Sequence, residues 1–248
     1  MKSRRIVVAA LLALAAPSAA FAQQQYGDPT NFPGTYLTQR TSPPVPGTNA
    51  TIDVTYFIDP GSFSGQDANL IRAAAAIWSN YMLTQAAVVL VEVNSAAGAG
   101  IVFTSADLND ATFNLAQRIL TTVPGAGTYP DGTPWRQITS ATITIDSDPP
   151  GAPGYFTGNG SVPVGRYDFL SLIIREFGVG LGLGFATNAD PNSVMDGNLA
   201  PGDQHQALSP TDIKALVTLY GAPEPATWAL FGIGLTVLAA RRRRSGPA

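Results

Sequence analysis

One carboxylate, Glu176, lies near the start of a glycine-rich stretch that runs from Ile174 to Phe185. Arg175 and Val179 stand at i and i+4, positions that share one helix face, and Phe185 follows a short way on. A catalytic zinc needs three protein donor groups at positions of this kind. Arginine is a permanent cation without an acceptor, however, and the valine and phenylalanine carry no donor atom. The spacing therefore fits a hydrolytic metal site, whereas the residue types do not.

This segment resembles the zinc helix and Met-turn of the metzincin proteases, whose pattern is H-E-x-x-H-x-x-G-x-x-H followed by a methionine turn. Glu176, Gly182 and Met195 match that pattern. Its three zinc-ligand positions are all degenerate here: Arg175, Val179 and Phe185. The resemblance implies that Glu176 is a vestigial general base, that Met195 packs beneath a cleft, and that no catalytic residue remains. We therefore expect no zinc cofactor and no enzymatic activity.

A rewritten ligand set is the alternative. The chain holds no cysteine and one histidine, His205, which could combine with carboxylates that are near it in sequence: Asp190, Asp196 and Asp203. Such a site would make the protein a divergent zinc metallopeptidase. Asp146 and Asp148 could hold calcium as an oxygen pair, although capping of a turn is the favoured interpretation. A further hypothesis is that the Arg175 guanidinium replaces the charge of the missing ion and pairs with an acidic group in the cleft.

The N-terminus has the pattern of a secretory signal peptide over residues 1–22. Lys2, Arg4 and Arg5 form a basic region, an apolar stretch follows, and Ala20-Phe21-Ala22 provides a small-x-small cleavage site. This signal predicts cleavage by signal peptidase and export of the protein. The following residues, 23–50, are rich in Pro, Gly, Gln and Thr and predict a flexible leader.

At the other end, Pro223, Glu224 and Pro225 precede an apolar run from Ala226 to Ala240, which is followed by four arginines, Arg241 to Arg244. The arginines predict a membrane stop on the cytoplasmic side. This arrangement over residues 222–248 resembles the PEP-CTERM sorting signal of Gram-negative bacteria. The resemblance implies recognition by an exosortase, transient anchoring in the inner membrane by a short transmembrane helix, and a final place on the cell surface or in a biofilm matrix.

The charge of the chain is distributed unevenly. Its formal net charge is −3, but seven of its 14 basic residues lie in the two terminal signals. Seven basic and 17 acidic residues remain between positions 6 and 240, which gives this part a formal charge of −10. Because such a surface repels polyanions, we expect no nucleic-acid partner. A peptide ligand remains open, as does an exopolysaccharide bridged by cations.

The middle of the chain predicts one domain over residues 51–221. We expect a first strand over Ile52–Ile58, a long helix after a capping box at Ser64 and Asp67, a cleft helix from Tyr167 to Leu181, and a last helix opened by Ser209. Further strands are expected at Val88–Val93, Ile101–Thr104 and Ala141–Asp146, and residues 109–129 are ambiguous. This order is similar to the catalytic domain of the matrixins, a metzincin branch, and implies an α+β fold with a twisted mixed sheet.

These observations lead to one interpretation. The protein is expected to be an exported, non-catalytic matrixin-like pseudopeptidase that acts as an extracellular binding or structural protein. The old substrate cleft could still hold an extended peptide by strand addition, because that binding mode uses backbone groups rather than a metal.

Overall fold

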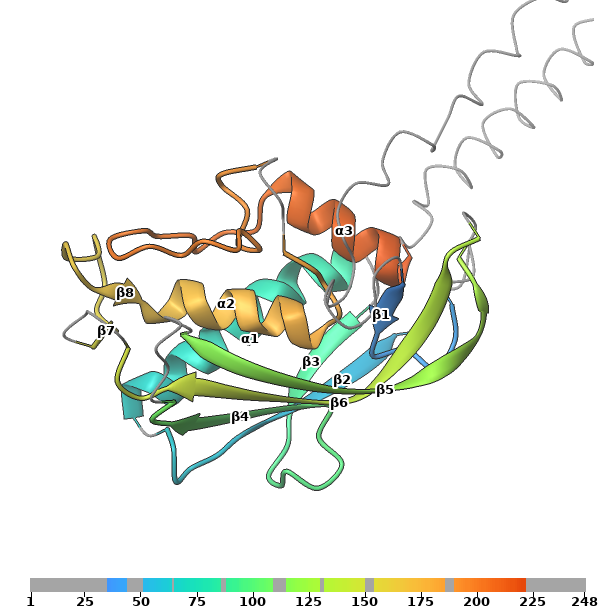
Figure 1. Ribbon diagram of the computed structural model, residues 1–248, viewed down its shortest axis with the longest axis horizontal. Helices are drawn as coiled ribbons and strands as arrows, with labels where there is room; N and C mark the ends of the chain where they lie inside the picture. The colour runs from blue at the N-terminus through green and yellow to red at the C-terminus, as the bar shows by residue number, and fades with distance from the viewer. Residues whose placement is uncertain are drawn as a thin grey trace, which may run out of the picture.

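A computed structural model describes residues 35–43, 51–63, 65–85, 88–108, 115–129, 132–149, 154–185 and 190–221. In this part of the chain, three helices lie on one face of a six-stranded sheet (Figure 1). The helices are α1 (Gly65–Gln85), α2 (Phe169–Gly180) and α3 (Pro210–Tyr220). The sheet strands are β1 (Tyr36–Thr38), β2 (Ile52–Ile58), β3 (Val88–Glu92), β4 (Ile101–Ala106), β5 (Ala116–Thr128) and β6 (Pro134–Asp146). A separate pair consists of β7 (Tyr155–Phe156) and β8 (Tyr167–Asp168).

The sheet is mixed, as predicted, but mostly parallel. Its strand order is β1-β6-β4-β2-β3, and every neighbouring pair along this path is parallel. β5 joins by pairing antiparallel with β6. The architecture is therefore a mixed α/β one, in which the crossover between the parallel strands β2 and β3 is made by α1, as parallel pairing requires.

The prediction of a flexible leader over residues 23–50 is wrong at β1. Tyr36, Leu37 and Thr38 pair in parallel with Trp135, Arg136 and Gln137 of β6. The Leu37 side chain is completely buried. Three residues are too few to show an alternating pattern, and the segment lies among Pro and Gly residues. Its structure comes from pairing with a distant strand, which local composition does not reveal.

The ambiguous region 109–129 contains β5. This 13-residue strand has register irregularities between Thr121 and Thr122 and between Pro124 and Thr128. Among the described strands it pairs only with β6, so it is an edge strand. Pro124 is tolerated on such an edge because proline lacks the N–H that a central strand must donate. The proline and glycines in the second half of β5 mask its strand pattern in the sequence.

The helices pack closely on one another and on the sheet. Trp78 of α1 is fully buried, and its Nε1 donates a hydrogen bond of 2.8 Å to the carbonyl oxygen of Ile174 in α2. α3 begins as predicted: Ser209 is its N-cap, Pro210 stands in its first turn, and Asp212 completes the capping box. This arrangement surrounds α2 with packed elements, which explains why a glycine-rich sequence remains helical there.

Candidate functional site

The N-terminus of α2 is fixed by its N-cap, Asp168. The Asp168 carboxylate accepts hydrogen bonds from the backbone N–H of Ser171 at 3.0 Å and from the Gln206 side chain at 2.9 Å. The observed helix, Phe169–Gly180, agrees with the expected Tyr167–Leu181 apart from its ends, where residues 167 and 168 form β8 instead. Almost every residue of α2 is buried.

The glycines of α2 permit this burial. A Cβ at Gly178 would overlap the sulfur of Met195, and a Cβ at Gly180 would come within 2.8 Å of the Ile101 side chain. Gly182 follows the helix with φ +93°, and a Cβ there would overlap the carbonyl oxygen of Leu37 in β1. Gly178 and Gly180 thus give close packing against Met195 and the sheet, and Gly182 allows both the left-handed backbone conformation after α2 and the close approach of β1.

The turn that contains Met195, called the Met-turn here, packs against α2 near Gly178. Met195 is completely buried. Its turn is held by Asp212 of α3, whose carboxylate accepts hydrogen bonds from the Ser193 hydroxyl and from the backbone N–H of Val194 at 3.1 Å. The same carboxylate accepts the Ser209 backbone N–H at 2.8 Å. One buried aspartate therefore ties the beginning of α3 to the turn that packs against α2.

Glu176 is the centre of a buried ion-pair cluster. Its side chain has no exposed surface, and both of its oxygens accept hydrogen bonds from Arg118 of β5 in a bidentate pair. The Nε of Arg175 donates a further hydrogen bond of 3.2 Å to Glu176 Oε1. The Arg175 side chain is 7% exposed and that of Arg118 is 22% exposed. Two guanidinium groups thus share one carboxylate.

The arginines keep this carboxylate ionised. Burial by itself raises the pKa of Glu176, but the attraction and hydrogen bonds of Arg118 and then Arg175 outweigh burial and hold the pKa below its ordinary value. Burial also lowers the pKa of Arg175, and the neighbouring Glu176 opposes that change. At neutral pH the cluster therefore contains two cations and one anion.

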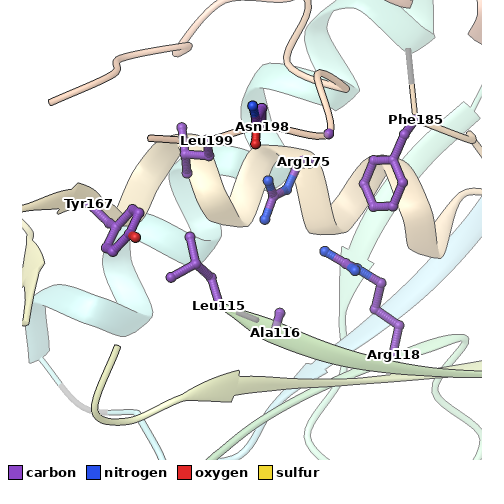
Figure 2. A pocket seen from close by; sticks show the side chains of 9 residues that line it. Leu115, Ala116, Arg118, Tyr167, Arg175, Phe185, Asn198 and Leu199 are labelled. Atoms are coloured by element: carbon purple, nitrogen blue, oxygen red, sulfur yellow. The ribbon is translucent and has the colours of Figure 1, made fainter. Parts of the chain in front are cut away.

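A cavity of about 190 Å³ opens beside this cluster. Figure 2 shows the guanidinium groups of Arg175, from α2, and Arg118, from β5, pointing toward one another across it. The Phe185 ring closes one side, with its centroid 4.9 Å from Arg118 Cζ and 5.9 Å from Arg175 Cζ. The rest of the wall combines residues next to or within β5, in β8 and after the Met-turn: Leu115, Ala116, Tyr167, Gly197, Asn198 and Leu199.

The three degenerate ligand positions lie in different surroundings. Arg175 and Phe185 line the same cavity, so the spacing of the motif does bring these two positions together. Val179 is 8% exposed and belongs to the hydrophobic core. Arg175 pairs with an acidic group, as hypothesised, but that group is its own neighbour Glu176.

The alternative donors take part in other hydrogen bonds. The carboxylates of Asp190, Asp196 and Asp203 accept backbone N–H groups from residues two or three positions away, and the backbone N–H of His205 donates to the Ser171 hydroxyl. Within the described ranges no group of three His, Cys, Asp or Glu side chains could hold a metal ion. Asp146 is buried, and its Oδ1 accepts the backbone N–H groups of Asp148, within the same turn, and of Leu108, from a distant segment.

Arg118 is the residue that sequence reasoning missed. It lies in the stretch left ambiguous, and no local motif marks it. In the structure, exposed and less exposed positions alternate along residues 116–122, and Arg118 falls on the inner face with Ala116 and Leu120. A charged residue on the inner face of a strand requires a partner inside the fold, and Glu176 is that partner.

The comparison with known protein families recognises only the end of the chain. The model of the PEP-CTERM protein-sorting motif matches residues 222–244. No curated protein matches the chain. The match indicates an exported protein that is processed by an exosortase, with a C-terminus that is transiently anchored in the membrane. The matched residues do not include 51–221, the range over which the sequence resembles the matrixins.

Several predicted features lie outside the described residues. They are the signal peptide over 1–22, Ser64 of the expected capping box, the Pro223-Glu224-Pro225 motif, the apolar run Ala226–Ala240 and the membrane-stop arginines Arg241, Arg242, Arg243 and Arg244. In the ranges that are described, none of the helices has the length and apolar character needed to span a membrane.

Proposed function

We propose that this protein is an exported, non-catalytic pseudopeptidase with a matrixin-like arrangement, which binds an extended peptide outside the cell, in a biofilm or on the cell surface. Residues 51–221, extended by β1, would form the binding domain. The exosortase that the sorting motif implies would release or transfer it after export. The observation that carries the proposal is the state of Glu176.

A general base in a hydrolase must lie within hydrogen-bond reach of the water that it deprotonates. Glu176 has no exposed surface, and its two oxygens are used by Arg118 and Arg175. A carboxylate with a lowered pKa is also a weaker base. These contacts support a structural role for Glu176 in place of the catalytic role that its position in the motif would give.

The residue types at the three ligand positions also support a protein without catalytic activity. A zinc ion prefers imidazole, thiolate and carboxylate donors. Arg175 repels a cation, Val179 is part of the core, and Phe185 offers only a ring that faces two guanidinium groups. This donor set favours a protein that has no use for zinc at the position where the resemblance would place it.

The edge of β5 supports peptide binding. Among the described strands β5 pairs only with β6, so its second edge presents backbone N–H and C=O groups to any strand that arrives there. Leu115, Ala116 and Arg118 place the beginning of this strand at the cavity. An extended peptide added to β5 would therefore pass along the cavity wall.

The test compares metal content, peptidase activity and binding in the full-length chain, purified in mild detergent. After dialysis against zinc we expect no stoichiometric zinc by mass spectrometry and no cleavage of a casein substrate. A library of extended peptides should contain members that bind saturably and shift the backbone amide NMR signals of β5. About one zinc per chain together with cleavage that Glu176→Gln abolishes would instead establish the divergent metallopeptidase. An absence of saturable peptide binding would leave a purely structural matrix protein.

A further inference from the structure

The cavity beside α2 has an excess of positive charge. Arg118 and Arg175 both reach it, and the carboxylate that they share, Glu176, is fully used by them. Among the described residues, Asp146, Tyr155 and Tyr167 are further titratable groups in this region. Asp146 is occupied by backbone N–H groups, and Tyr155 is a neutral phenol that donates to the carbonyl of Leu115 at 3.2 Å. Arg118, Arg175 and Glu176 by themselves have a formal charge of +1, and Asp146, the other acidic group in this region, does not line the cavity.

Arg175 is the part of the cluster that is open to a ligand. Its side chain is 7% exposed, and among the described residues Glu176 is its one hydrogen-bond acceptor, reached through Nε. The remaining guanidinium edge points into the cavity (Figure 2). A planar guanidinium edge of this kind matches a carboxylate with two parallel hydrogen bonds. A buried charge without full compensation is costly, so an arriving anion would be stabilised.

We propose that the cavity is a binding site for a single carboxylate group, supplied by an acidic side chain of a bound peptide. The carboxylate would accept hydrogen bonds from the guanidinium edge of Arg175. Tyr167 and Asn198, on other walls of the cavity, supply polar groups beside it. Phe185 covers the arginines on one side, which lowers the local dielectric and strengthens the contact. The assignment to a peptide rests on the proposed function.

Charge and size favour this ligand over the alternatives. The part of the chain between positions 6 and 240 has a formal charge of −10, which repels a polyuronate or another polyanion at long range. An excess of one positive charge is matched by a monoanion rather than by a dianion. A cavity of about 190 Å³ holds one small group and not a folded chain. Because the cavity adjoins the first residues of β5, a peptide on that edge can place one side chain in it.

The experiment follows the side-chain Nε–H signals of the arginines by NMR in the full-length chain, in mild detergent. Sodium acetate is the probe, and acetamide, which has the same shape without the charge, is the control ligand. Arg72 is the internal control, because it forms an exposed bidentate pair with Glu92. We expect acetate to shift the Arg175 signal saturably, acetamide to have no effect, and Arg72 to remain unchanged. Equal shifts of Arg72 and Arg175, or a linear response of Arg175, would overturn the site.

Variants separate the site from general electrostatics. Arg175→Gln should abolish saturable acetate binding, Arg175→Lys should weaken it, and Arg72→Gln should leave it unchanged. If Arg175→Gln does not fold, the comparison of acetate with acetamide on the wild-type chain still decides the question. Acetate binding that survives in a folded Arg175→Gln protein would refute the assignment to Arg175.

Two peptides then test the source of the carboxylate. An acetylated Ala-Glu-Ala amide should bind at least about tenfold more tightly than its glutamine counterpart, the ratio expected from one charge-assisted hydrogen bond. Equal binding of both peptides, with shifts in the β5 backbone amides, would preserve the proposed peptide function and overturn the carboxylate site. Acetate binding without any β5 response to the peptides would preserve the carboxylate site and overturn strand addition. Tighter binding of trigalacturonate than of the glutamate peptide would assign the site to an acidic glycan.

Discussion

Arg118 and Glu176 form a bidentate ion pair across 58 positions of sequence, and this pair joins the edge strand β5 to the helix α2. Because the Glu176 side chain is fully buried, water does not solvate its carboxylate in place of Arg118. The residue that resembles a catalytic base is therefore best understood as an anchor for the strand that borders the cavity.

The first prediction concerns the energy of this anchor. Glu176→Gln should lower the free energy of unfolding by about 3 to 5 kcal/mol, because it leaves the buried guanidinium group of Arg175 and the partly buried one of Arg118 without a countercharge. Glu92→Gln is the matched control, since Glu92 forms a bidentate pair with Arg72 on the surface and should contribute only about 0 to 1 kcal/mol. Urea denaturation followed by far-UV circular dichroism measures both. Equal effects of the two substitutions would show that the buried cluster is not a major source of stability.

The second prediction is a loss of stability in acid. Arg118 and Arg175 hold the pKa of Glu176 below its ordinary value of 4.5 in the folded chain, so the unfolded chain takes up this proton first as the pH falls. The stabilisation is complete above about pH 4.5 and is lost as the pH drops through the lower folded value. The melting temperature of the wild type should therefore decrease as the pH is lowered from 4.5. In Glu176→Gln this decline should be shallower, and parallel curves for the two proteins would contradict the assignment.

The sequence predicted the elements that carry their own local signals. The N-cap and Pro at the start of α3 and the helical spacing of α1 appear as expected. β1 and Arg118 could not be predicted in this way. Leu37 is buried only because β6 supplies its hydrogen-bonding partners from a distance of about 100 positions, and Arg118 acquires its role only when β5 faces α2. Both depend on tertiary contacts rather than on local propensity.

A third prediction tests whether β1 is structural. Leu37→Ala should lower the free energy of unfolding by about 2 to 5 kcal/mol, because it removes a fully buried side chain from the core. Leu83→Ala on α1 is the control, since Leu83 is 52% exposed and its substitution should change stability by only about 0.5 kcal/mol. Thermal and urea denaturation measure both. A Leu37→Ala protein as stable as Leu83→Ala would restore the interpretation of this segment as a flexible leader.

The fourth prediction concerns the contact between α2 and the Met-turn. A Cβ on Gly178 would overlap the sulfur of Met195, so Gly178→Ala should destabilise the protein by about 1 to 3 kcal/mol despite the better helix propensity of alanine. Gly178→Ala combined with Met195→Ala should then be less destabilising than the sum of the two single substitutions. Gly61→Ala, whose new Cβ would meet its nearest neighbour at 3.5 Å, is the control for overpacking. Additive effects at Gly178 and Met195 would disprove the contact.

The last prediction concerns the joint between α3, β1 and the end of α2. Tyr220 is buried; its hydroxyl donates a 2.8 Å hydrogen bond to the Leu181 carbonyl and accepts one of 3.2 Å from the backbone N–H of Gln39. Burial raises the pKa of Tyr220 to about 12. Its contribution to stability is therefore complete below pH 10 and is lost as the pH rises toward 12, because the unfolded chain ionises first.

Tyr220→Phe should lower the free energy of unfolding by about 1 to 2 kcal/mol at neutral pH through the lost hydrogen bonds. It should also reduce the alkaline loss between pH 10 and 12. Part of that loss will remain, because burial raises the pKa of Tyr56 to about 12 as well. The free energies of unfolding of the wild type and Tyr220→Phe are measured at pH 7 and pH 11. An equal decrease in both proteins would show that Tyr220 does not ionise on unfolding as the buried geometry requires.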